Sequence, residues 1–291
     1  MTDILKRLEK EILLLDGPIG TELMARGIAA GEVSELWVLE KPDVIAEVHK
    51  SYFDAGADIV LTNTFGGTEL KLAAFGLGER MEEINRKAAE IVRSQCPEGK
   101  YVGGDIGPTG KLVKPYGDAE PDDLKRVFAE QAKALAEGGV DFFIIETMMD
   151  LTEALAAVAG AKETGLPVFA SLTYNKKKRG YFTEMGNKPT DAARALVEAG
   201  ASGVGANCTL RIGDMVDLVG EIRGAVNVPV FVEPNAGSPE LVDGKAKYVD
   251  GPEEFAAVVP DLVRAGANIV GGCCGTTPQT IAAARRVLDS M

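Results

Sequence analysis

The sequence predicts a (β/α)8 barrel, or TIM barrel, formed as a single domain by residues 1–291. Eight short apolar runs, each suited to a buried parallel strand, alternate along the chain with segments of helical periodicity. A chain of 291 residues has the length of one such barrel, which commonly uses about 250 residues. No G-x-G-x-x-G turn follows the first run, so an open dinucleotide-binding sheet is disfavoured.

The first half of the chain contains four of the predicted strands. Residues 1–12 have the charge pattern of an amphipathic helix. The second and fourth runs, like the sixth and eighth of the chain, pair a glycine that can end a helix with a small or Asx residue and a short apolar stretch. The four runs are EILLLDG (11–17), AGADIVLTNT (55–64), YVGGDIG (101–107) and GGVDFFIIET (138–147).

The second half supplies the other four strands. Proline opens two of them, a position that a strand tolerates. The four runs are LPVFASLT (166–173), AGASGVGANC (199–208), VPVFVEPN (228–235) and AGANIVGGCC (265–274). Between the strands, segments such as 121–139 and 148–165 carry apolar residues at three- and four-residue spacing and are predicted to be helices.

Composition limits the possible partners. The 44 acidic and 31 basic residues give a net charge of −13, which repels a phosphate backbone and disfavours nucleic acid. No segment approaches the roughly 18 uninterrupted apolar residues of a membrane span, and the start of the chain has no secretion signal. We therefore expect a soluble, cytoplasmic protein without a membrane partner.

Polar residues collect at the carboxyl ends of the predicted strands, the face of a barrel where active sites lie. They interrupt runs that are otherwise apolar, so this clustering is what an active site would produce. The strand-end residues are Asp16, Thr62, Asn63, Asp105, Glu146, Thr173, Asn207, Cys208, Glu233, Asn235, Cys273 and Cys274.

Three of the four cysteines, Cys208, Cys273 and Cys274, stand at the ends of the sixth and eighth strands. Alternate strands of a barrel direct side chains into the same layers, so three thiols can converge on one ion. Three sulfur ligands leave a tetrahedral Zn²⁺ one ligand short, which is typical of catalytic zinc. A disulfide between adjacent cysteines would be strained. Cys96, which precedes a loop, is interpreted as a packing residue.

A helix is predicted to start directly after Cys273 and Cys274. Thr276 or Thr277 can cap it, and Pro278 suits its first turn. The positive end of the helix dipole lowers the pKa of nearby thiols and so favours the thiolates that bind a metal.

The single histidine, His49, lies in the helical pattern PDVIAEVHKSYFDAG, one turn from Ile45 and from Phe53. It is interpreted as a packed helix residue and not as a ligand or base.

Several motifs together resemble the homocysteine S-methyltransferase family, over essentially the whole chain. The likeness is greatest to the homocysteine-binding module of cobalamin-dependent methionine synthase. The motifs are DGPIGTEL (16–23), ADIVLTNTFG (57–66), GDIGPTG (104–110), IIETMMD (144–150), GANC (205–208), EPNAG (233–237) and GGCCGTTPQ (271–279).

The resemblance implies a (β/α)8 barrel with one zinc ion on Cys208, Cys273 and Cys274, which accepts the thiol of homocysteine as fourth ligand. It implies that Asn235 occupies the open position without substrate and that Glu146 pairs with the substrate ammonium group. Zinc coordination deprotonates a thiol, whose reference pKa is about 8.5, so this chemistry needs no histidine base.

The loop after the first strand is predicted to bind the substrate carboxylate. Its backbone N–H groups, around Gly17, Gly20 and Thr21, precede a predicted helix and can hold an anion. Asp16 is expected either to orient this loop or to touch substrate. Asn207 is a candidate substrate contact, or a residue that fixes the loop carrying Cys208.

The methyl donor implied by the resemblance is a methylated corrinoid, methylcobalamin, because residues 35–65 are similar to the methionine synthase module. The betaine-using branch has a tyrosine after the phenylalanine that matches Phe65, whereas Gly66 stands here; a quaternary ammonium donor needs an aromatic cage. The chain ends after the barrel and lacks the cobalt-ligating D-x-H-x-x-G motif, so we expect the corrinoid on a separate partner protein.

One segment departs from the resembled pattern. Residues 174–189, YNKKKRGYFTEMGNKP, are basic and aromatic where that module usually has a shorter Gly, Ser and Thr sequence. The segment is interpreted either as a partner-docking or acceptor-tuning element, or as a solvated surface loop.

Other functions remain open on the sequence. The donor can instead be S-methylmethionine, S-adenosylmethionine or betaine, and the acceptor another small thiol. The chain can also be a non-catalytic subunit that binds homocysteine or zinc within a larger methyl-transfer complex. A metal-free barrel lyase is disfavoured because no lysine stands at a predicted strand end.

Overall fold

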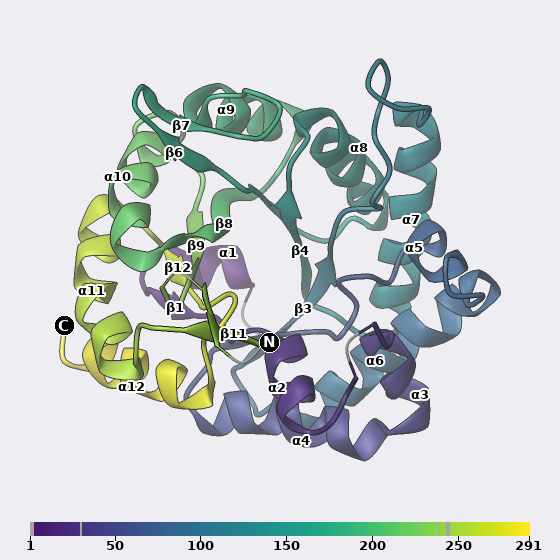
Figure 1. Ribbon diagram of the computed structural model, residues 1–291, viewed down its shortest axis with the longest axis horizontal. Coiled ribbons are helices and arrows are strands. Elements are labelled where there is room, and N and C mark those ends of the chain that lie inside the picture. The colour runs from purple at the N-terminus through teal and green to yellow at the C-terminus, as the bar shows by residue number, and fades with distance from the viewer. Residues whose placement is uncertain (1–2, 30, 238, 243–244) are drawn as a thin grey trace.

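The computed structural model describes residues 3–29, 31–237, 239–242 and 245–291. Eight parallel strands form a barrel that is surrounded by helices (Figure 1). The strands are β1 (Leu13–Leu14), β2 (Ile59–Leu61), β3 (Tyr101–Ile106), β4 (Phe142–Met148), β5 (Val168–Leu172), β8 (Gly203–Arg211), β9 (Val230–Asn235) and β12 (Ile269–Val270). Each overlaps one predicted run, so the predicted (β/α)8 fold is confirmed.

The strands pair in the order β1-β12-β9-β8-β5-β4-β3-β2. A parallel bridge between Leu15 and Ile59 joins the two ends of this order. Around it, the amide of Asp58 donates to the carbonyl oxygen of Leu14 at 2.7 Å, and the amide of Asp16 donates to that of Ile59 at 3.1 Å. The barrel is therefore closed between β1 and β2.

Helices follow the strands, as predicted. They are α1 (Ile4–Leu8), α2 (Ile19–Ala25), α3 (Trp37–Glu40), α4 (Pro42–Asp54), α5 (Glu69–Ala73), α6 (Met81–Gln95), α7 (Pro121–Glu137), α8 (Leu151–Ala161), α9 (Pro189–Ala199), α10 (Ile212–Arg223), α11 (Pro252–Ala265) and α12 (Pro278–Asp289). Proline opens α7, α9, α11 and α12, where its missing N–H costs nothing. No helix in the described ranges combines the length and the apolar character of a bilayer span.

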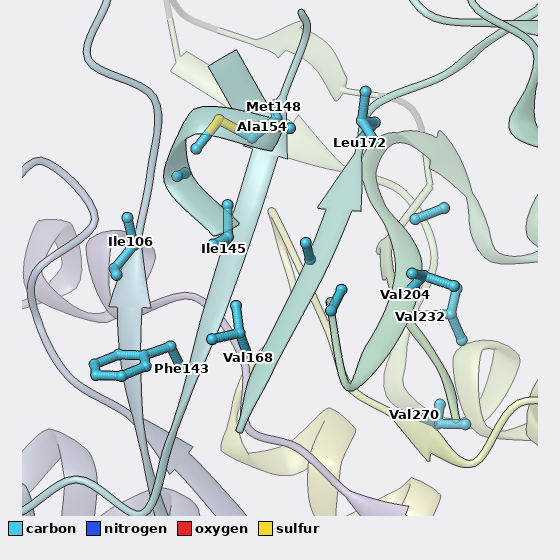
Figure 2. Close-up of a cluster of buried hydrophobic side chains, with 14 of the residues drawn as sticks. Ile106, Phe143, Ile145, Met148, Ala154, Val168, Leu172, Val204, Val232 and Val270 are labelled. Carbon is cyan, nitrogen blue, oxygen red and sulfur yellow. The ribbon is translucent and has the colours of Figure 1, made fainter. Parts of the chain in front are cut away.

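Two apolar layers hold the barrel together, because side chains alternate along each strand. Phe143 and Ile145 of β4 point outward and pack with helix residues in the larger cluster, part of which Figure 2 shows. Phe142 and Ile144 point inward and pack with Phe169 and other residues of the barrel interior.

Helix α1 belongs to the inner layer. Its buried residues Ile4 and Leu8 pack in the same cluster as Leu13, Ile59 and Ile269 from the strands. The predicted amino-terminal helix is thus confirmed, although α1 covers fewer residues than the pattern suggested.

Segment 174–189, for which the sequence predicted no strand, contains a β-hairpin. Strands β6 (Asn175–Lys177) and β7 (Gly180–Phe182) pair in antiparallel orientation. The hairpin is fixed to α10, because the hydroxyl of Tyr181 donates to the carbonyl oxygen of Asp214 at 2.8 Å and Lys176 donates to its carboxylate at 2.6 Å. A second hairpin joins β10 (Pro239–Val242) and β11 (Lys245–Tyr248).

Candidate active site

A cavity of about 260 Å³ opens at the carboxyl ends of the strands. Its described lining contains five acidic side chains, Asp16, Glu35, Asp105, Glu146 and Glu233, and no lysine, arginine or histidine. A pocket of this composition favours cations, so the electrostatics suit a metal ion, an ammonium group or both.

The cavity gathers seven of the ten predicted site residues. Those that line it are Asp16, Gly17, Gly20, Glu146, Cys208, Cys273 and Cys274. Thr21, Asn207 and Asn235 are not part of the lining, although Asn207 and Asn235 lie on the strands that carry it.

The three strand-end thiols converge. The Sγ atom of Cys274 lies 4.0 Å from that of Cys208 and 3.9 Å from that of Cys273, and all three lie within 4.8 Å of one another. Zinc–sulfur bonds of about 2.3 Å in a tetrahedron place two sulfurs about 3.8 Å apart. The observed separations therefore fit a single tetrahedral ion with three sulfur ligands.

Unusual backbone conformations occur at this site. Thr147, Cys208 and Thr209 have φ values of 60°, 59° and 54°, and they are the non-glycine residues of the described chain with positive φ. Strand register also shifts between Ile145 and Met148 and between Asn207 and Arg211. Such conformations cost roughly 1–3 kcal/mol each and cluster at functional sites.

The cysteine pair is fixed to the end of β9. The amide of Cys273 donates to the carbonyl oxygen of Pro234 at 2.8 Å, and the amide of Ala236 donates to that of Cys274 at 3.0 Å. Asn235 lies between these two contacts, and its buried Oδ1 has no hydrogen-bond partner. Of the two predicted caps, Thr277 is the one that caps α12.

Hydrogen bonds among the three thiols shift the pKa values of Cys273 and Cys274 in opposite directions. Hydrogen bonds from Cys208 and Cys273 lower the pKa of Cys274 to about 3, whereas the pKa of Cys273 is raised by its hydrogen bonds with Cys208 and Cys274. An interaction with the side chain of Tyr248 also lowers the pKa of Cys274. Its ring packs so closely on Gly275 that a Cβ there would lie 2.1 Å away. Sequence reasoning missed Tyr248, because no motif connects it to the cysteines.

Glu146 is fixed by its neighbours on β4 and β8. Its Oε2 accepts from the amide nitrogen of Asn207 at 2.6 Å and from the hydroxyl of Thr147 at 3.1 Å. The Oδ1 of Asn207 accepts from the amide of Thr147 and from the hydroxyl of Ser171, both at 2.8 Å. Asn207 is therefore fixed by β4 and β5, and it orients the carboxylate of Glu146 through its own hydrogen bond. Burial raises the pKa of Glu146 to about 7.

The other acidic residues differ in their partners. Asp16 accepts the amide of Leu61 at 2.9 Å, and Glu35 accepts the amide of Gly66 at 2.6 Å. Asp105 Oδ1 and Glu233 Oε1 are buried without a hydrogen-bond partner. Burial raises the pKa of Asp16, Asp105 and Glu233 well above the ordinary range.

Two residues lie outside the site, as interpreted from the sequence. His49 is fully buried in α4, and burial lowers its pKa to about 3, so the imidazole is neutral. Cys96 follows α6 and does not belong to the thiol cluster.

Comparisons with known proteins show similarity over most of the chain. The family model described as homocysteine S-methyltransferase matches residues 13–288. The chain is 32% identical over 299 residues to the methionine synthase of Mycobacterium tuberculosis, covering 96% of this chain and 25% of that protein. It is 31% identical over 300 residues to the methionine synthase of Mycobacterium leprae, covering 96% of this chain and 24% of that protein. The chain thus spans about a quarter of the length of these relatives.

A solved structure is similar over the full barrel. The homocysteine methyltransferase MmuM from Escherichia coli, in its metallated form, has a TM-score of 0.81 and 25% sequence identity. The match covers 98% of this chain and 99% of that one.

Proposed function

Because the chain belongs to the homocysteine S-methyltransferase family, we propose that it transfers a methyl group to the thiol of homocysteine and forms methionine. We propose further that a zinc ion activates the thiol and that a methylcorrinoid supplies the methyl group. The observation that carries the proposal is the convergence of three thiols beside a pocket lined with acidic side chains.

Cys208, Cys273 and Cys274 would hold the metal. Their Sγ separations of 3.9 and 4.0 Å match the roughly 3.8 Å of tetrahedral zinc, and the unpartnered Oδ1 of the adjacent Asn235 is a further donor. A Zn²⁺ ion there would supply the positive charge that ionises the substrate thiol near neutral pH.

The amino-acid part of the substrate would bind toward the first and fourth strands. Glu146, fixed by Asn207 and Thr147, would accept the ammonium group. The described lining has no cationic side chain, so neutral donors such as backbone N–H groups would hold the carboxylate. The backbone around Gly17, Gly20 and Thr21, at the start of α2, is the proposed site. Asp16, which lines the same cavity, is a further candidate contact.

The corrinoid would be carried outside these 291 residues. The only histidine is the buried His49, and no D-x-H-x-x-G sequence surrounds it. The similarity to two methionine synthases, over 96% of this chain, supports methylcobalamin as donor. The donor would meet the activated thiol at the open face of the barrel.

The proposal is tested with the purified, zinc-loaded chain, L-homocysteine and methylcobalamin labelled with ¹³C in the methyl group. We expect labelled methionine in the mass spectrum. S-Methylmethionine, S-adenosylmethionine and betaine are tried separately, and so is a corrinoid protein. Zinc X-ray absorption is expected to show one additional sulfur neighbour when homocysteine is added. Homocysteine binding without methionine from any donor would instead indicate a binding subunit.

A further inference from the structure

Tyr248, the last residue of β11, lies against the thiol cluster. A Cβ at Gly275, the residue after Cys274, would collide with its ring. The phenol is close enough to Cys208, Cys273 and Cys274 to interact electrostatically with each of them, and Cys274 is the strongest partner of the three. Tyr248 does not line the cavity, so it approaches the thiols from outside the substrate pocket.

The backbone beside Tyr248 is anchored to the cysteine pair. The amide of Asp250 donates to the carbonyl oxygen of Ala236 at 3.1 Å, and the amide of Ala236 donates to that of Cys274 at 3.0 Å. This chain of hydrogen bonds joins the end of the β10–β11 hairpin to the thiol cluster. The ring of Tyr248 therefore has a defined position over Gly275.

We propose that the hydroxyl of Tyr248 donates a hydrogen bond to the sulfur of Cys274 when the three thiols hold the metal, and that Tyr248 is a positioning residue which stabilises the zinc site. This inference rests on the proposed metal site and adds to it a residue beyond the three ligands.

Charge supports this assignment. Three thiolates exceed the charge of one Zn²⁺ ion by one negative charge, and the thiolate of a bound substrate would raise this excess to two. The described lining of the cavity adds five acidic side chains and no cationic one. A neutral O–H donor stabilises a thiolate through a charge-assisted hydrogen bond. A phenol is such a donor, because its ordinary pKa of about 10 leaves it protonated at neutral pH.

The thiols cannot provide this hydrogen bond to one another once they hold a metal. As protonated groups, Cys273 donates to the sulfur of Cys274, and Cys208 lies 4.0 Å from that sulfur. Zinc binds cysteine as the thiolate, so these protons are lost on binding. Of these three side-chain partners of Cys274, Tyr248 is then the one that keeps a proton to donate.

The test uses Tyr248→Phe, which removes the hydroxyl and keeps the ring over Gly275. Tyr116→Phe is the matched control, because Tyr116 is 71% exposed on the connection between β3 and α7. The zinc dissociation constant of each full-length chain is measured by competition with a chromophoric chelator. Each chain is also loaded with Co²⁺, whose sulfur-to-metal charge-transfer absorption reports the electron density on the ligating sulfurs. Circular dichroism checks the fold.

We expect Tyr248→Phe to weaken zinc binding by about 10- to 100-fold, the range for losing an outer hydrogen-bond partner of a metal ligand. The Co²⁺ charge-transfer band should move to longer wavelength, because a sulfur without the hydrogen bond gives up electron density more readily. A residue that only packs against the site would leave this band in place. Tyr116→Phe should match the wild type in both measurements.

Either an unchanged zinc affinity or an unmoved Co²⁺ band in Tyr248→Phe would overturn the inference. Its failure is distinguishable from failure of the proposed function. If the wild-type chain binds neither Zn²⁺ nor Co²⁺ through its cysteines, the proposed metal site itself fails. If the wild type binds both ions and Tyr248→Phe behaves identically, only the assigned role of Tyr248 fails.

Discussion

At the scale of single residues, backbone conformation and backbone hydrogen bonds determine where the three thiols lie. Cys208 adopts a left-handed conformation, and Cys273 is tied to β9 through its amide. The site therefore does not depend on a cysteine side chain for its shape. A cysteine variant should remove the ligand and leave the barrel intact.

Cys208→Ala is expected to lose both bound zinc and turnover, because two sulfurs cannot hold the ion as three do. Zinc per chain is measured after dialysis, and the fold by circular dichroism. Cys96→Ala is the matched control and should retain zinc and activity, since Cys96 lies outside the cluster. Collapse of the fold in Cys208→Ala would instead indicate a structural metal.

The sequence could predict which residues meet at this site but not how each is used. Polar residues that end apolar runs predicted Cys208, Cys273, Cys274 and Glu146 because barrel topology brings strand ends together. Nothing local predicts that Glu35 reaches the cavity, since it lies in a short 3-10 helix (Ser34–Leu36) and not at a strand end.

At the scale of elements, the glycines of β8 set how closely the strands approach. A Cβ on Gly205 would lie 2.2 Å from the carbonyl oxygen of Phe231, its partner on β9. Because this neighbour is backbone, it cannot move aside as a flexible side chain can. Glycine at 205 is therefore needed for β8 to place Asn207 and Cys208 at the carboxyl ends of the strands, where the cavity lies.

Gly205→Ala is expected to destabilise the chain by roughly 1–3 kcal/mol or more, the range of overpacking in a core. The free energy of unfolding is measured by urea titration. Gly220→Ala, in the interior of α10 with no atom within 4 Å of the added Cβ, should stabilise by about 0.5–1 kcal/mol. Similar stability of the two variants would contradict this account of β8.

Element prediction succeeded for the barrel, whereas no strand was predicted in the segment that forms hairpin β6–β7. The eight strands are continuous apolar runs, which buried parallel strands require. The hairpin sequence NKKKRGYF has no alternation of apolar and polar residues that would mark a strand. Its side chains contact Asp214, which is distant in sequence.

At the scale of the whole molecule, buried carboxyl groups couple stability to pH. Burial raises the pKa of Glu146 from its ordinary value of 4.5 to about 7, so the folded chain binds more protons than the unfolded chain between these values. This contribution to stability is complete below about pH 4.5 and is lost as pH rises through 7. Asp16, Asp105 and Glu233 act in the same direction. Cys274 and His49, whose pKa values are lowered to about 3, act in the opposite direction, but the four carboxyl groups outnumber them.

We therefore expect the metal-free chain to have a higher thermal midpoint at about pH 5.5 than at about pH 8. Differential scanning calorimetry measures both. Glu146→Gln removes one titrating group and should reduce the difference. Greater stability at the higher pH would show that these carboxyl groups are not buried as described.

The short distance between Cys208 and Cys274 also affects how the protein must be handled. Their sulfurs lie 4.0 Å apart, so they need little movement to form a disulfide when an oxidant accepts two electrons. This disulfide would consume two of the three proposed metal ligands. Aerobic storage after chelation should therefore produce a chain that no longer takes up zinc until a reductant is added, while prior loading protects it.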